Sequence, residues 1–239
     1  MRSYVSYPEL DELGEALIKD YIKKTKQRNV MCVDIEGFVT GYLGLKLVYE
    51  SFAEEDSSKI GFMSDGVTPL KVWRKNKPTL VVFPEFTVVL DRFLLHDNES
   101  GRHRFTLAHE GAHKILAKHN PMQMAAFCRV YDSENNYSPE DIKRMFSLGE
   151  SQADRLGATL IMPRFIVEKV LKKFSNGRLV KIYGGSVFAP EDKITLQKMA
   201  DCMGVPFTAL IIRLRNLKML EQRDLSEYIE SNLQFGGVL

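Results

Sequence analysis

The segment His109-Glu110-Gly111-Ala112-His113 constrains this chain more than any other, because it matches the pattern H-E-x-x-H. Residues four apart on a helix lie on one face, so both imidazoles can bind a single metal ion. The surrounding segment, from about Arg102 to His119, has apolar residues at helical spacing. The motif therefore falls on a predicted helix, as a metal site of this kind requires.

Glu110 is the glutamate of the motif and directly follows the first histidine. Zinc lowers the pKa of a bound water to about 7 in favourable sites. Glu110 can then take a proton as that water attacks a carbonyl group. The pattern predicts one Zn²⁺ per chain, with His109 and His113 as ligands and Glu110 as the catalytic base. A surface helix with two unrelated histidines is the alternative.

A catalytic zinc site needs a third protein ligand, and His119 is the first candidate. It lies six residues after His113, as in the long zinc motif with three histidines. That motif needs a glycine three residues after the second histidine, and Leu116 holds the place. On an unbroken helix His119 points away from the other two by about 120°. We therefore expect His119 to be an exposed histidine near the end of the helix.

Glu150 is the better candidate, because Asp154 lies four residues later on the same helix face. Metal-binding histidines usually donate their other ring N–H to a carboxylate. Glu150 as ligand and Asp154 as the group that orients a histidine make one coherent arrangement. The small residues Ala153, Gly157 and Ala158 would let the two helices approach closely. The residues alone leave open that this is an exposed face with two solvated carboxylates.

Hydrophobic spacing along the rest of the chain predicts an α+β fold that is mainly helical. The predicted helices are Tyr7–Thr25, Val33–Tyr42, Arg102–His119 and Glu150–Ile161. Another helix is predicted to start at Ser138-Pro139-Glu140, and further helices follow from Ile194 onward. Four short runs rich in β-branched and aromatic residues predict a small antiparallel sheet: Ile60–Met63, Leu70–Trp73, Thr79–Phe83 and Thr87–Leu90. Residues 96–101 are expected to form a loop, and residues 174–190 a loop or hairpin. We predict a main domain over residues 1–175 and a small helical segment over 190–239.

Charge and cysteine content limit the partners and the cell compartment that we expect for this protein. The net charge of +2 gives no electrostatic reason to expect nucleic acid or a membrane surface as the main partner. Cys32, Cys128 and Cys202 are too few and too widely spaced for a disulfide framework. The N-terminus has no signal-peptide pattern, and no apolar run is long enough to span a membrane. We expect a cytoplasmic protein.

Two sequence blocks resemble the ImmA/IrrE family of bacterial and phage metallo-endopeptidases. They are Arg104–Glu110 and Glu150–Asp154, supported by Leu160-Ile161-Met162-Pro163 and Val89-Leu90-Asp91. The resemblance covers roughly residues 30–165. It implies a zincin-like fold, a single zinc ion and Glu150 as the third ligand. It also implies the substrate class, a DNA-binding transcriptional repressor that is cleaved to switch on genes of a mobile element or a stress response.

The chain departs from the family pattern at two places. The family usually has glycine just before the second metal histidine, whereas Ala112 stands there and Gly111 precedes it. The spacing from His113 to Glu150 is also long, and we expect residues 120–147 to be a surface elaboration rather than part of the substrate cleft. The group that stabilises the oxyanion is not assigned, with His103, Tyr137 and Tyr183 as the candidates.

Residues 196–205 and 209–217 resemble a helix-turn-helix, which the family resemblance also implies after the peptidase domain. Base readout needs polar side chains early in the recognition helix. Here that helix begins Pro206-Phe207-Thr208-Ala209-Leu210, and Arg213 and Arg215 come late. We expect a packing or substrate-docking module rather than a DNA reader.

Two rival functions remain open beside the endopeptidase. One is a metal-containing binding module that docks a repressor or toxin partner without cutting it, and that would tolerate Glu110→Gln. The other is a DNA-binding regulator acting through the C-terminal segment, which predicts salt-sensitive and sequence-selective DNA binding.

Overall fold

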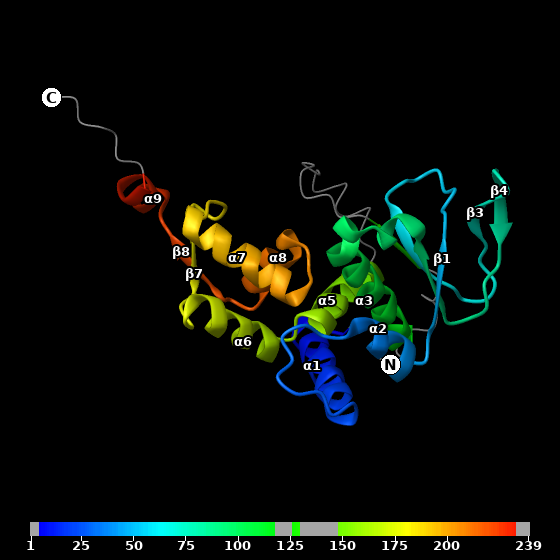
Figure 1. The fold of residues 1–239 in the computed structure, drawn as a ribbon, viewed down its shortest axis with the longest axis horizontal. Coiled ribbons are helices and arrows are strands. Elements are labelled where there is room, and N and C mark those ends of the chain that lie inside the picture. The colour runs from blue at the N-terminus through cyan, green and yellow to red at the C-terminus, as the bar shows by residue number, and fades with distance from the viewer. Residues whose placement is uncertain (1–4, 118–125, 130–147, 233–239) are drawn as a thin grey trace.

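The computed structural model describes residues 5–117, 126–129 and 148–232, which form a mixed α+β fold (Figure 1). The described helices are α1 (Tyr7–Lys24), α2 (Ile35–Gly37), α3 (Ser100–Ala117), α5 (Leu148–Ile161), α6 (Arg164–Ser175), α7 (Pro190–Met203), α8 (Phe207–Asn216) and α9 (Leu225–Asn232). Shorter turns are the π-helical η1 (Phe38–Tyr42) and the 3₁₀ turns η2 (Arg92–Leu95) and η3 (Asp97–Glu99). The strands are β1 (Lys46–Glu50), β2 (Lys59–Met63), β3 (Leu70–Arg74), β4 (Lys77–Val81), β5 (Thr87–Asp91), β6 (Ala126–Arg129), β7 (Val180–Tyr183) and β8 (Leu220–Arg223).

The expected α+β class is confirmed, and so are the helices predicted over residues 7–25, 33–42 and 150–161. The helix predicted over residues 102–119 is present as α3, which is described to Ala117. α1 shows why local signals suffice, because Glu9 accepts a hydrogen bond from the Ser6 N–H at 2.8 Å at its start. The helix start predicted at Ser138 and the candidate ligand His119 lie outside the described residues.

The main sheet differs from the one expected. Its order is β1-β5-β2-β6, with β2 antiparallel to β5 and to β6 but β1 parallel to β5. The sheet is therefore mixed, and the prediction of a purely antiparallel sheet was wrong. The strand at Lys46–Glu50 was not predicted, because its alternation is only partly apolar and its partner lies about forty residues away at Thr87–Asp91.

The other two predicted strands, β3 and β4, form a separate hairpin rather than joining the main sheet. Lys75 and Asn76 connect them, and both have positive φ, as a two-residue type I′ turn requires. One face of the hairpin packs into a second small core that contains Phe62, Leu70 and Val72. The hairpin stands at the edge of the molecule, away from the C-terminal helices (Figure 1).

Three helices pack one against the next beside the main sheet. α3 packs against β2 and β5 of the sheet and against α5, and α5 packs in turn against α1 (Figure 1). Their buried apolar side chains, together with those of α7 and α8, belong to one core. The division into domains 1–175 and 190–239 stays a prediction. None of the helices in the described ranges has the length and apolar character needed to traverse a bilayer.

The C-terminal part contains α6 to α9 and a small parallel pair formed by β7 and β8. Residues 174–190, predicted as a loop or hairpin, contain β7 followed by a tight turn at Gly184 and Gly185. The predicted helical stretch from Ile194 onward is α7 and α8, joined by a short turn in which Gly204 has positive φ. The strand β8 and its parallel pairing with β7 were not expected.

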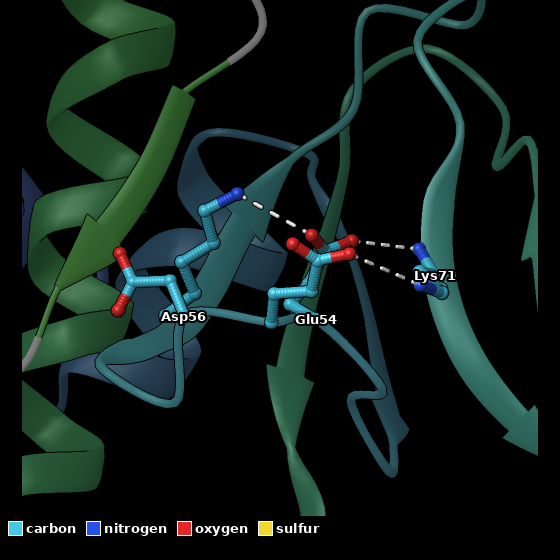
Figure 2. A pocket seen from close by; sticks show the side chains of 5 residues that line it. Glu54, Asp56 and Lys71 are labelled. Carbon is cyan, nitrogen blue, oxygen red and sulfur yellow. Dashed lines mark hydrogen bonds and ion pairs between the residues drawn. The ribbon is translucent and has the colours of Figure 1, made fainter.

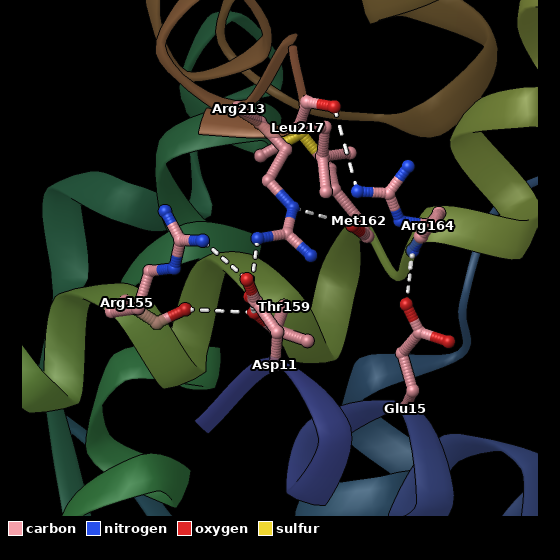
Figure 3. A network of polar contacts seen from close by, with 8 residues as sticks. All are labelled: Asp11, Glu15, Arg155, Thr159, Met162, Arg164, Arg213 and Leu217. Atoms are coloured by element: carbon pink, nitrogen blue, oxygen red, sulfur yellow. Dashed lines mark hydrogen bonds and ion pairs between the residues drawn. The ribbon is translucent and has the colours of Figure 1, made fainter. Parts of the chain in front are cut away.

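A buried polar network fastens α8 to α1 and α5 (Figure 3). Arg213 is fully buried, donates to the Met162 carbonyl at 2.9 Å, and pairs with Asp11 at 2.6 Å. Asp11 also accepts a hydrogen bond from Thr159 at 2.6 Å and pairs with Arg155. We call Asp11, Arg155, Thr159 and Arg213 the Asp11 network.

Candidate metal centre

The helix α3 brings the two motif histidines together, as their spacing predicts. His109 and His113 are 2% and 4% exposed, and their Nε2 atoms lie 3.0 Å apart. Neither position is on a surface face of the helix. The reading of two unrelated surface histidines therefore does not fit the structure.

Glu150, in the first turn of α5, completes the group. Its Oε2 atom lies 3.3 Å from Nε2 of His109 and 3.6 Å from Nε2 of His113. Tetrahedral zinc with bonds of about 2.0–2.1 Å separates its ligand atoms by about 3.4 Å. The three atoms thus form a triangle of the right size, and His109, His113 and Glu150 can hold a metal ion.

The electrostatics of the site favour the protonation states that a metal needs. Burial lowers the pKa of His113, which leaves its imidazole neutral at pH 7. Burial alone would raise the pKa of Glu150, but its contacts with His109 and His113 outweigh that effect and bring the pKa to about 2. A neutral imidazole and an ionised carboxylate are the forms that coordinate metal ions.

Asp154 lies one turn after Glu150 and reaches the other nitrogen of His109. Nδ1–H of His109 donates to Oδ1 of Asp154 at 2.8 Å. When a metal ion takes the place of the contact between Nε2 and Glu150, this bond would hold His109 in the tautomer that leaves the Nε2 lone pair free. The predicted arrangement of Asp154 behind a histidine is thus present in the geometry.

Close packing of α5 on α3 depends on one glycine. A Cβ atom placed on Gly157 would lie 3.0 Å from both the backbone N and the Cα of His109. Ala153, one turn earlier, is fully buried. Small residues at these positions let the helix that carries Glu150 lie directly against the helix that carries His109.

Glu110 is fully buried and follows His109 on the same helix.

Two of the three candidates for oxyanion stabilisation, His103 and Tyr183, lie within the described residues. His103 lies two turns earlier on α3, and its Nε2 is 2.9 Å from the Tyr49 hydroxyl. Tyr183 lies on β7, with its ring 5.3 Å from that of Tyr228, on the far side of α7 and α8 from α3 (Figure 1). The structure brings neither residue to the metal ligands.

Two further sequence predictions lie outside the described residues. These are Tyr137, the third oxyanion candidate, and nearly all of the 120–147 segment, of which β6 alone is described. Its strand pairs antiparallel with β2 at the edge of the sheet.

A polar hollow lies where the chain leaves β1 for β2 (Figure 2). Its lining residues carry charges of both signs: Glu54, Glu55, Asp56, Lys59 and Lys71. Glu54 pairs with Lys59 at 3.3 Å and accepts a hydrogen bond from the Lys71 backbone N–H at 2.9 Å. Among the described residues, the group that could hold a metal ion is His109, His113 and Glu150, and the lining of this hollow contributes no member to it.

No family model matches the chain. No curated protein matches it either. The chemistry of the His109, His113 and Glu150 group is therefore the basis for assigning a function.

Proposed function

We propose that this protein is a zinc-dependent endopeptidase that hydrolyses a peptide bond in a protein substrate. One observation carries the proposal: two histidine nitrogens and one carboxylate oxygen form a triangle with sides of 3.0, 3.3 and 3.6 Å. Two histidines and a glutamate, with an open fourth position, are a ligand set of hydrolytic zinc enzymes.

The residues around the triangle have separate tasks. A zinc ion held by His109, His113 and Glu150 would lower the pKa of a bound water and polarise a carbonyl oxygen. Glu110 accepts a proton from the attacking water and returns it to the leaving amine. Asp154 holds His109 in the ligating tautomer. Burial of His109, Glu110 and His113 excludes bulk water, which strengthens the electrostatic interactions among them.

The resemblance to the ImmA/IrrE family supports the finer parts of the proposal. Its two sequence blocks, Arg104–Glu110 and Glu150–Asp154, lie on α3 and α5 where these helices meet. A metal-binding helix packed on one face of a small sheet agrees with a zincin-like fold. On this basis we propose a DNA-binding transcriptional repressor as the substrate.

The C-terminal helices contribute packing rather than DNA recognition in this proposal. Arg213 on α8 is fully buried against Asp11, so its charge is turned away from any phosphate. Arg215 donates to the Gly185 carbonyl at 2.8 Å. The first turn of α8 offers apolar side chains where a DNA reader needs polar ones.

Metal content tests the ligand set. We expect about one zinc per chain in purified wild-type protein, and a sharp fall in Glu150→Ala. Glu168→Ala, which removes an exposed glutamate on α6, is the matched control and should keep the metal. Unchanged zinc in Glu150→Ala would exclude Glu150 as a ligand, and no zinc in any of the proteins would remove the basis of the proposal.

Cleavage tests the role of Glu110. Mass spectrometry of protein N-termini in cells that express the wild type should reveal a new terminus within a DNA-binding repressor. Glu110→Gln should bind zinc equally and generate no such terminus. If Glu110→Gln instead keeps the full biological effect, the protein acts as a binding module that docks its partner without cutting it.

A further inference from the structure

The β3–β4 hairpin has apolar side chains on both of its faces. Side chains alternate along each strand, so Leu70, Val72 and Val81 point to one face and pack into the second core. Lys71, Trp73, Pro78 and Leu80 point to the opposite face, which we call the outer face. The alternation continues past the end of β4 to Val82.

The outer face is open to solvent. Trp73 is 48% exposed, Leu80 66% and Val82 52%. Trp73 lies directly opposite Pro78 in the register and diagonal to Leu80, so these side chains form one stripe. Strands with apolar residues on both faces are ordinarily covered on both. Within the described ranges no segment covers the outer face.

Strand addition to the free edge of β4 is disfavoured by Pro78. The residues that flank the two-residue turn, Arg74 and Lys77, form a hydrogen-bonded pair, so the next pair, Trp73 and Pro78, directs its backbone groups outward. The outward direction of Trp73 is confirmed by its N–H, which donates to the Ser51 carbonyl at 2.8 Å. Proline has no N–H to offer a new strand. The side chains of the outer face, rather than the backbone edge, are therefore left to make contacts.

The tip of the hairpin adds positive charge beside the apolar stripe. Arg74 is neutralised by Glu50, a buried carboxylate on β1. Lys75 lies in the turn and forms no ion pair with any residue that the structure describes, and Lys71 lies on the outer face directly opposite Leu80, 3.9 Å from Glu55. Lys75 at the tip and Lys71 within the outer face make this stripe complementary to a segment that carries both carboxylates and large apolar side chains. They also repel a second copy of the same face.

We propose that the outer face of the hairpin docks an acidic polypeptide segment with large apolar side chains, with Trp73 as the anchor. Exposed apolar patches mark interaction sites, and tryptophan is one of the residue types that contribute most to the binding free energy of protein interfaces. This docking surface is separate from the metal centre. It goes beyond the proposed peptidase activity and does not depend on it.

Trp73 is also the probe, because it is the only tryptophan of the chain. The probe ligand is a synthetic peptide of alternating glutamate and leucine with a central phenylalanine. We expect it to shift Trp73 emission to shorter wavelength in a saturable way, and added salt to weaken the binding. A peptide with lysine in place of glutamate should bind at least about tenfold more weakly. Equal binding of the two peptides, or no shift with the acidic one, overturns the proposal.

Variants that keep the tryptophan locate the binding. Leu80→Ser and the pair Lys71→Glu/Lys75→Glu should each weaken binding of the acidic peptide about tenfold. Ile194→Ser, which removes an exposed apolar side chain on α7, and Lys172→Glu/Lys198→Glu, which reverses exposed charges on α6 and α7, should change nothing. Circular dichroism checks that each variant is folded. Unchanged binding by folded Leu80→Ser overturns the proposal.

Measurements on the protein without peptide provide a further test. Trp73 should be readily quenched by iodide, and sedimentation should show no association that depends on Trp73. Protection of Trp73 from iodide in a monomer would mean that another segment of this chain covers the face. Protection that appears with dimerisation would mean that a second copy covers it. Either result overturns the proposal.

Discussion

Asp154 determines which nitrogen of His109 is free to bind metal, so its effect should appear in metal affinity rather than in folding. Removing the carboxylate in Asp154→Ala releases the ring and frees its tautomer. We expect the affinity for zinc to fall about 10–100-fold. Competition with a chromophoric chelator measures this change.

The same titration with Glu168→Ala controls for the loss of a carboxylate on a neighbouring helix, and its affinity should equal that of the wild type. An Asp154→Ala protein that also keeps wild-type affinity would show that His109 is oriented by its packing alone.

Residues of the metal centre could be anticipated because their signal is local. The spacing of His109 and His113, and of Glu150 and Asp154, places each pair on one helix face whatever the rest of the fold does. Arg213 could not be anticipated in the same way. Arginine is rarely buried, and its partner Asp11 lies 202 residues away with no pattern that links the two.

At the scale of elements, α5 is polar on two opposite sides. Glu150 and Asp154 face α3, whereas Arg155 and Thr159 face Asp11 on α1. On an ideal helix Asp154 and Thr159 are about 140° apart. The helix is therefore fixed from both sides, and its distance from α3 sets the position of Glu150.

Gly157→Ala tests that distance. The added methyl would lie 3.0 Å from His109 backbone atoms, which cannot rotate away, so α5 must shift. We expect a loss of about 1–3 kcal/mol in the free energy of unfolding, together with weaker zinc binding. Urea unfolding and chelator competition on the same samples measure the two effects.

Gly41→Ala is the matched control, since a Cβ at Gly41 meets no atom within 4 Å. It should leave both quantities close to the wild-type values. If Gly157→Ala is equally silent, the two helices are not held as tightly as the geometry indicates.

The pairing of the strands could not be predicted from the sequence, although most of the strands could. The runs of β-branched and aromatic residues in β2, β3, β4 and β5 mark each as a strand, but they do not say which strands pair. The chain inserts the whole β3–β4 hairpin between β2 and β5, which are neighbours in the sheet. The parallel partner β1 comes from before both, so the mixed sheet follows from contacts distant in sequence.

At the scale of the whole molecule, the Asp11 network joins α1, α5 and α8, which come from the two ends and the middle of the chain (Figure 3). Asp11→Asn leaves the buried Arg213 without its counter-charge. We expect this to lower the free energy of unfolding at pH 7 by about 3–5 kcal/mol, as measured by urea unfolding. Glu12→Gln, a substitution at an exposed position of the same helix, should cost little.

The pH dependence of that loss has a definite sign. Burial favours the neutral form of Asp11, but hydrogen bonds from Thr159, Arg155 and Arg213 outweigh it and lower its pKa below 3.8. A lowered pKa in the folded state means that the carboxylate stabilises the protein fully above the unfolded value near 3.8. The gap between wild type and Asp11→Asn should be constant from neutral pH downward and close as the pH falls through and below 3.8. A gap that widens in acid would contradict this assignment.

Because α5 is held from both sides, metal binding and the packing of α1 and α8 onto α5 are thermodynamically linked. If the Asp11 network increases zinc affinity by positioning Glu150, zinc binding must stabilise the Asp11 network by the same free energy. Adding zinc should therefore slow hydrogen exchange in α1 and α8, far from the ion, and Asp11→Asn should weaken zinc binding without touching a ligand. In a cell short of zinc, α1 and α8 would then open more often, so the supply of metal would govern the lifetime of the protein as well as its activity.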